Sequence, residues 1–181
     1  MSATTSTVPR QEPISPQGRP SHSPGRARGG LASLAAASLS LMAALIHLWV
    51  APEHFAEWWG HGAFFMISAA CQGLFAVMIL RWPASNTVLF AGIAGNLVIV
   101  LLYVISRTWG MPFGADWILF SPSVAHLEDP DLLGMLATAA ELGIIAASVA
   151  LLDARPRRLI VNVLLLVGAG VWALRIFGIL P

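Results

Sequence analysis

The chain has 181 residues, of which 57% are hydrophobic and only 10% are charged, and its formal net charge is +1. Average soluble domains carry about 25% charged residues, so this composition excludes an ordinary soluble globular domain and indicates a protein whose main solvent is lipid. The single cysteine, Cys71, excludes a disulfide within the chain.

Residues 1–30 form a basic tail. They include five prolines and many Ser, Thr and Gly residues, with no apolar periodicity. Such a segment cannot bury enough apolar surface to offset its ordering entropy, so we expect it to be disordered. Its four arginines directly precede the first apolar run. This position favours topogenic charge and contact with anionic lipid headgroups, and we expect no nucleic-acid partner.

Five apolar runs follow the tail, and each is long enough to cross a lipid bilayer as a helix. About 20 helical residues at 1.5 Å per residue span the roughly 30 Å hydrocarbon core. The sequence therefore predicts an all-α fold, a polytopic membrane helix bundle that occupies residues 31–181. The expected transmembrane helices cover about residues 31–50, 61–80, 87–106, 132–152 and 159–180.

The first run also has some features of a signal peptide. Its length of about 20 residues exceeds the roughly 7–15 residues of a signal-peptide apolar region, and no suitable small-x-small motif precedes Pro52. We therefore expect an uncleaved first span.

Arginines near the ends of the spans predict the orientation, because cytoplasmic loops are enriched in basic residues. With the N-terminus inside, eight arginines face the cytoplasm: four in the tail, Arg81 in the 81–86 turn and three in the 153–158 turn. Arg107 and Arg175 face the other side. This asymmetry predicts a multi-pass protein of the inner or plasma membrane with a cytoplasmic N-terminus and an extracytoplasmic C-terminus.

The predicted outer turn between the first two spans, HLWVAPEHFAEWWGH, holds three of the five histidines and two acidic residues. On an ideal helix these five side chains fall within a sector of about 120°, roughly one helix face. Imidazole and carboxylate groups suit Zn²⁺, Cu²⁺, Fe, Mn or Ni. A divalent transition metal or haem is therefore the cofactor considered, and the candidate ligands are His47, Glu53, His54, Glu57 and His61.

Pro52 interrupts this turn. A proline inside a helix removes a backbone donor and clashes with the preceding turn, whereas it fits the first turn of a new helix. We therefore expect the first span to end at Val50 and a short outer helix to run from Pro52 to about Trp59, after a fold-back of the chain. Two alternatives to a metal site stay open: an amphipathic turn anchored in the interface by its aromatic residues, and a proton-transfer role for His47.

A 25-residue connection, RTWGMPFGADWILFSPSVAHLEDPD, joins the third and fourth spans on the same side. It holds Arg107, His126 and Asp131, which we consider as further contributors to the outer site. Five tryptophans map near this boundary, and anchoring at the level of the lipid headgroups explains them.

Polar residues also lie close to the midpoints of the second, third and fourth spans: Gln72, Asn96 and Glu141. A charge at the centre of a spanning helix costs about 2.5–3.5 kcal/mol on insertion scales, so such residues face the protein interior and find partners. We expect hydrogen bonds of Glu141 with Gln72 or Asn96, or an ion pathway through these residues. Arg175 lies roughly 6 Å shallower than Glu141 and pairs with it if their helices are neighbours.

Three segments, IHLWVAPEHFAEWWGHGAFF, GNLVIVLLYVISRTWGMPFG and DLLGMLATAAEL, give the chain a resemblance to a group of small, uncharacterised bacterial multi-pass membrane proteins. The likeness covers about residues 41–152. The resemblance implies a functional role for the outer turn, for the stretch from Asn96 to Arg107 and for Glu141. It implies no reaction, cofactor or catalytic residue.

Three functions are consistent with the sequence. The first is binding or translocation of a metal ion or proton, captured by the outer His/Glu site and relayed by Glu141 with Asn96 and Gln72. The second is a non-catalytic interaction or assembly subunit, whose partner is another membrane protein or a second copy of the chain. The third, which we rank last, is an intramembrane metal-dependent enzyme with Glu57 as base. In every case the lipid bilayer is the main partner.

Overall fold

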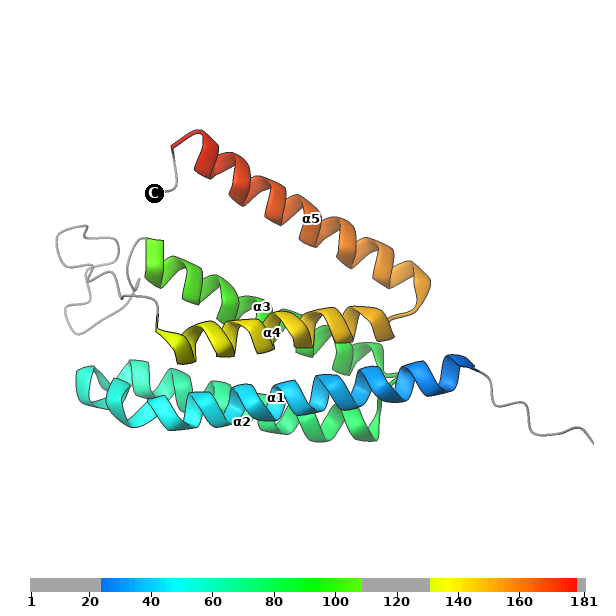
Figure 1. The fold of residues 1–181 in the computed structure, drawn as a ribbon, viewed down its shortest axis with the longest axis horizontal. Helices are drawn as coiled ribbons and strands as arrows, with labels where there is room; N and C mark the ends of the chain where they lie inside the picture. The colour runs from blue at the N-terminus through cyan, green and yellow to red at the C-terminus, as the bar shows by residue number, and fades with distance from the viewer. Residues whose placement is uncertain (1–23, 109–130, 179–181) are drawn as a thin grey trace, which may run out of the picture.

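The residues that the structure describes fold into five long α-helices (Figure 1). The structure, a computed structural model, describes residues 24–108 and 131–178. Each helix is long and apolar enough to cross a bilayer, which confirms the predicted all-α fold with five candidate spans. The helices are α1 (Pro24–Glu57), α2 (Trp59–Arg81), α3 (Asn86–Thr108), α4 (Leu132–Leu151) and α5 (Ala154–Ile176).

Helices α1 to α4 form the packed part of the molecule. α1 packs along α2 and α4, and α3 packs on α4 and touches α2, whereas α5 diverges from the bundle and touches only α4 (Figure 1). Both α1 and α4 bury small residues: Ala36, Ala43 and Ala140 are at most 1% exposed. Small side chains let two helix backbones approach closely within a membrane, which brings polar side chains of the two helices within reach of one another.

Helix α1 runs without a break through Pro52 to Glu57. The prediction that the first span ends at Val50 and that a separate outer helix begins at Pro52 is therefore wrong. A proline inside a helix costs about 3 kcal/mol, and the packing of α1 along α2, with the neighbouring Ala51 buried, offsets that cost. As a consequence, His47 and His54 lie on one continuous helix, about 10 Å apart along its axis.

Two helices begin earlier in the chain than predicted. α1 begins at Pro24, seven residues before the expected start at Leu31, and residues 1–23 of the predicted tail lie outside the described residues. α5 begins at Ala154, with Pro156 in its first turn. A proline is tolerated in the first turn of a helix, where its missing donor has no partner in any case. In both helices the added residues include arginines. Each helix therefore extends beyond its apolar run into a basic segment.

A single residue, Trp58, separates α1 from α2. Its backbone is extended (φ −163°, ψ 134°), which ends the helical path of α1. A Cβ atom at Gly60 would overlap the Trp58 ring, and one at Gly62 would overlap the Phe55 ring. The two glycines therefore let aromatic rings fold across the start of α2, so the chain reverses within a few residues.

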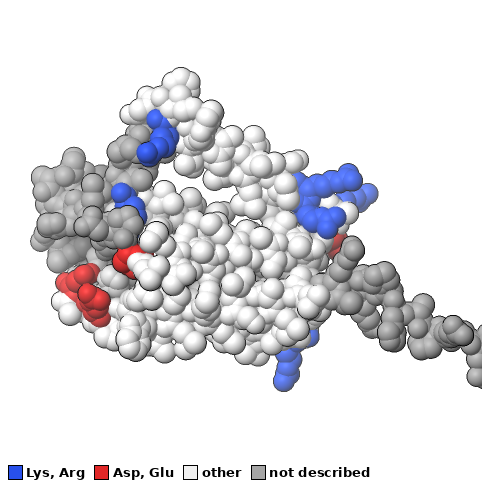
Figure 2. Space-filling model, viewed as in Figure 1, with Lys and Arg blue, Asp and Glu red and all other residues white. Residues whose placement is uncertain are grey.

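Charged side chains lie toward the two ends of the bundle, with a broad surface of uncharged residues between them (Figure 2). Many large apolar side chains on this surface are exposed, among them Leu45, Ile67 and Leu165, as expected for helices that face lipid. We call the end that carries the α1–α2 turn, the end of α3 and the start of α4 the histidine end. The opposite end, with Arg81 and Arg155, is the arginine end.

Candidate functional site

A hydrogen-bonded network in the middle of the bundle joins four helices, and Gln72 of α2 is its centre. His47 Nδ1 donates to Gln72 Oε1 at 3.0 Å. Gln72 Nε2 donates to Asn96 Oδ1 at 3.3 Å and to Glu141 Oε1 at 3.4 Å. All four side chains are buried. The structure thus brings together the three polar residues that the sequence placed at one depth, and it adds His47 of α1.

Two further hydrogen bonds hold this network in place. Ser40 Oγ donates to the backbone carbonyl of Gln72 at 2.7 Å, and Asn96 Nδ2 donates to the backbone carbonyl of Gly92 at 2.8 Å. Together with its bonds to His47, Asn96 and Glu141, the Gln72 side chain uses its oxygen and both of its N–H groups within the protein. A buried polar network whose members are all satisfied keeps them in one arrangement.

His47 and Glu141 form a buried pair within this network. His47 Nε2 lies 3.4 Å from Glu141 Oε1. Because the amide oxygen of Gln72 only accepts hydrogen bonds, the proton of a neutral imidazole lies on Nδ1, and Nε2 is the nitrogen that faces the carboxyl group. A hydrogen bond between Nε2 and Oε1 at 3.4 Å then requires one further proton, carried by one of the two groups.

A cavity of about 100 Å³ extends from this pair to the histidine end. Its lining includes His47 and Glu141 as well as His54 and His61, and Asp131 at its rim is 59% exposed. The volume corresponds to roughly three water molecules at ~30 Å³ each. The other lining residues come from the same four helices: Ile46, Val50, Phe64, Phe65, Ile99, Leu102, Tyr103, Ser106, Arg107, Gly134, Ala137 and Thr138.

The bundle is closely packed on the arginine side of the pair. Residues toward that end include Ala36 of α1, Ile79 of α2, Leu89 of α3 and Ile144 of α4, and each is fully buried. They belong to one apolar core cluster. Within the described residues, the cavity therefore reaches the buried pair from the histidine end, and buried apolar residues lie between the pair and the arginine end.

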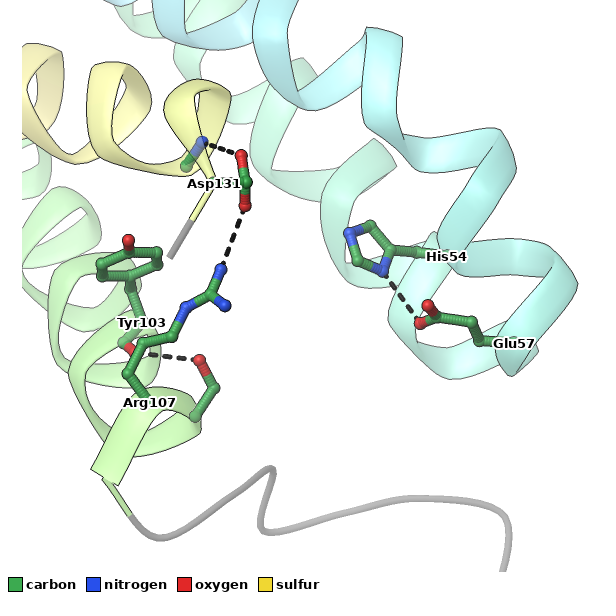
Figure 3. Close-up of polar contacts among 7 residues, drawn as sticks. His54, Glu57, Tyr103, Arg107 and Asp131 are labelled. Atoms are coloured by element: carbon green, nitrogen blue, oxygen red, sulfur yellow. Dashed lines mark hydrogen bonds and ion pairs between the residues drawn. The ribbon is translucent and has the colours of Figure 1, made fainter. Parts of the chain in front are cut away.

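A second group of ligand-type side chains lies at the histidine end. One ligand atom from each of His54, Glu57 and His61 lies within 4.8 Å of the others. His54 Nδ1 is 3.0 Å from Glu57 Oε2 (Figure 3), and His61 Nδ1 is 3.8 Å from the same oxygen. Nitrogen and oxygen ligands that share one tetrahedral Zn²⁺ lie about 3.4 Å apart. Small side-chain rotations would therefore bring this group into a coordinating geometry.

Aromatic rings pack against both imidazoles of this group. The Phe65 ring stacks on His54, with ring centroids 4.2 Å apart and an angle of 8° between the planes. Trp58 meets His61 edge-on, with ring centroids 5.1 Å apart. The Phe65 ring also lies 5.5 Å from the His47 ring, so it contacts a histidine of each group.

Arg107 and Asp131 line the cavity on the side opposite His54 (Figure 3). Arg107 Nη2 donates to Asp131 Oδ2 at 3.1 Å, and the guanidinium lies over the Tyr103 ring, 5.0 Å from its centroid. Asp131 Oδ1 also accepts from the backbone N–H of Gly134 at 2.6 Å, which caps the start of α4. This ion pair therefore ties the end of α3 to the start of α4.

The other residues proposed from the sequence lie apart from both groups. Glu53 is exposed and does not belong to the group of three. His47 lies deeper than that group, at the opposite end of the cavity. Glu141 bonds to Gln72 and His47, and Arg175 is an exposed residue of α5. His126 lies outside the described residues.

Sequence reasoning missed Phe65 and Tyr103, and it predicted Ser40 only as a helix-packing hydroxyl. Their signal is helical spacing from residues that were singled out. Phe65 follows His61 by four residues and Tyr103 precedes Arg107 by four, so each is a neighbour on one helix face. Ser40 precedes His47 by seven residues, close to two helical turns.

We call His54, Glu57 and His61 the outer group. Their donor atoms fit a first-row transition metal. Two imidazoles and one carboxylate are common ligands of Zn²⁺ and related divalent ions. Haem does not fit the space that the described residues enclose. The cavity of about 100 Å³ is well below the roughly 300–1,000 Å³ of pockets that take drug-sized ligands.

Comparisons with protein-family models, with curated proteins and with solved structures found no match for this chain.

Proposed function

We propose that this protein captures a divalent transition metal ion on the extracytoplasmic side, at His54, Glu57 and His61, and passes it inward along the cavity. At the inner end, the His47–Glu141 pair exchanges a proton with the cavity. The observation that carries this proposal is the shared lining, because one space contacts both outer imidazoles and both members of the buried pair.

The outer group has the properties of a capture site. Its side chains are partly accessible, at 19% exposure for His54, 14% for His61 and 52% for Glu57. The carboxylate of Glu57 also lies beside both imidazoles, and a negative group near a cleft raises the local concentration of cations. These features favour a cation over an anionic or apolar ligand.

The cavity supports passage because it offers polar groups at membrane depth. An ion that enters hydrocarbon without such groups meets a prohibitive desolvation cost. Here the hydroxyls of Tyr103, Ser106 and Thr138 belong to lining residues, and the space holds water-sized ligands. The buried apolar residues toward the arginine end fit a conformation that is accessible from one side only, as alternating access requires.

A second candidate is a non-catalytic assembly subunit, and the position of α5 favours it. None of its residues is buried, so this helix offers its surface to lipid or to another membrane protein. In that case the polar network would serve helix packing alone, and substitutions in the outer group would leave metal uptake unaffected.

The two candidates are separated by zinc uptake into proteoliposomes that contain a zinc-sensitive dye. We expect the wild-type protein to take up Zn²⁺ and the His54→Ala/His61→Ala variant to lose most uptake, because only one ligand of the outer group is left. Glu53→Gln is the matched control, since Glu53 is an exposed carboxylate of the same turn outside the group, and it should retain uptake. Wild-type uptake equal to that of empty liposomes would refute the transport proposal.

A further inference from the structure

We infer that the buried His47–Glu141 pair is itself a second metal position, in which His47 Nε2 and a carboxylate oxygen of Glu141 bind the ion that has passed the outer group. This inference rests on the proposed function and extends it from one coordination position to two. The ligand class is the same: a divalent first-row transition metal with nitrogen and oxygen ligands.

The spacing of the two atoms is the first argument. His47 Nε2 and Glu141 Oε1 lie 3.4 Å apart, and two ligands at about 2.0–2.2 Å from a tetrahedral Zn²⁺ are separated by about 3.4 Å. Both residues line the cavity, whose volume leaves room for the water ligands that would complete the coordination shell.

The partners of the pair are the second argument. A histidine that ligates a metal almost always donates its other ring N–H to an oxygen, and a ligating carboxylate accepts hydrogen bonds in turn. Gln72 supplies both functions, because its Oε1 accepts from His47 Nδ1 and its Nε2 donates to Glu141 Oε1. Gln72 therefore acts as a positioning residue, which leaves His47 Nε2 directed toward the carboxylate.

Binding at this position exchanges a proton for the metal ion. In the metal-free pair, a hydrogen bond between Nε2 and Oε1 requires one proton on one of these two atoms. When the ion binds to these two atoms, that proton leaves to water in the cavity. The Nε2 lone pair and a lone pair of the carboxylate oxygen are then donated to the metal ion. Metal binding at the inner position thus releases one proton per ion.

The number of bound ions tests the inference. Equilibrium dialysis of the detergent-purified chain against Zn²⁺ should give two ions per wild-type chain and one per His54→Ala/His61→Ala variant. Glu141→Gln, which keeps a hydrogen-bonding side chain at the buried position, should also bind one. The combined variant should bind none. Circular dichroism of each variant confirms that the helices are retained.

The outcomes separate the inner position from the outer one. We call His54→Ala/His61→Ala the outer variant. If the wild-type chain binds one ion, and this ion is kept in Glu141→Gln but lost in the outer variant, the second position is overturned and the proposed function stands. No ion on the wild-type chain overturns both. The visible absorption of Co²⁺ bound to the outer variant provides a second readout, because a nitrogen and oxygen coordination sphere at the inner pair gives bands that Glu141→Gln must remove.

The role of Gln72 has its own test. Gln72→Met removes the amide at similar volume, and loss of a hydrogen-bonding partner behind metal ligands lowers affinity by about 10–100-fold. We expect that loss at the inner position only, measured with Zn²⁺ on the outer variant. Cys71→Ser is the control, since Cys71 is adjacent in sequence but exposed. An unchanged affinity in Gln72→Met would refute the positioning role.

Discussion

Ser40 and Ser148 are both fully buried but differ in their hydrogen bonds. The Ser40 hydroxyl donates to the Gln72 carbonyl, whereas the Ser148 hydroxyl has no hydrogen-bond partner among the described residues. A buried polar group without a partner costs free energy that an alanine at the same position would not. The two serines therefore make opposite contributions to stability.

We expect Ser148→Ala to raise the free energy of unfolding by about 1 kcal/mol, because the substitution removes an unsatisfied hydroxyl. Ser40→Ala should lower it by about 0.6 kcal/mol, the average for a hydrogen bond between membrane helices. Unfolding in mixed detergent micelles, followed by circular dichroism, measures both changes. Equal effects of the two substitutions would contradict this assignment of hydrogen bonds.

At the residue scale, the sequence predicted the mid-membrane partners better than it predicted the place of His47. A polar side chain inside hydrocarbon must find a partner, so the meeting of Gln72, Asn96 and Glu141 followed from depth alone. His47 was grouped with the outer turn because Pro52 was expected to fold the chain back. Only the continuity of α1 shows that His47 lies about 10 Å below His54.

Helices α2 and α3 meet where a glycine faces a phenylalanine. A Cβ atom at Gly92 of α3 would overlap the ring of Phe75, which is itself buried. A Cβ atom at Gly95, one turn later on the same helix, would meet no atom within 4 Å. The close approach of these two helices therefore depends on one glycine and not on the other.

We expect Gly92→Ala to lower the free energy of unfolding by about 1–3 kcal/mol, the usual range for overpacking a core. Gly95→Ala should stay within about 0.5 kcal/mol of the wild type, as is usual for an exposed position. The same detergent unfolding assay compares the two variants. If Gly95→Ala were the more damaging substitution, the packing of α3 against α2 described here would be incorrect.

Helix boundaries show which physical signals the sequence carries clearly. The run length of apolar residues predicted α2, α3 and α4 to within about two residues at each end, because hydrocarbon thickness fixes the length of a span. Pro52 was misleading, since a local helix-breaking preference was outweighed by packing between α1 and α2. That packing depends on contacts between distant residues, which periodicity along one segment does not reveal.

The whole molecule has an uneven distribution of charge between its two ends (Figure 2). Arginines of the α4–α5 turn lie at the arginine end, and the acidic residues of the α1–α2 turn lie at the histidine end. Basic residues favour the cytoplasmic side of a membrane. The arrangement therefore supports an orientation in which both candidate metal positions are reached from outside the cytoplasm.

This orientation can be tested with reporter fusions. We expect a reporter that is active only outside the cytoplasm to be active when fused after Pro181 and inactive when inserted in the 81–86 turn, because five spans separate the two faces in alternation. Cytoplasmic activity of the fusion after Pro181 would reverse the orientation. The outer group would then face the cytosol.

Helix α5 has a consequence for how the molecule responds to its bilayer. Its 23 residues include none that is buried, and Ile160 and Leu164 are its partly buried contacts with the apolar core. With so few protein neighbours, its tilt depends on acyl-chain length and on the anchoring of Arg155 and Trp172 at the lipid headgroups. A thicker or thinner membrane would reorient this helix while the four-helix unit that carries both histidine groups keeps its shape.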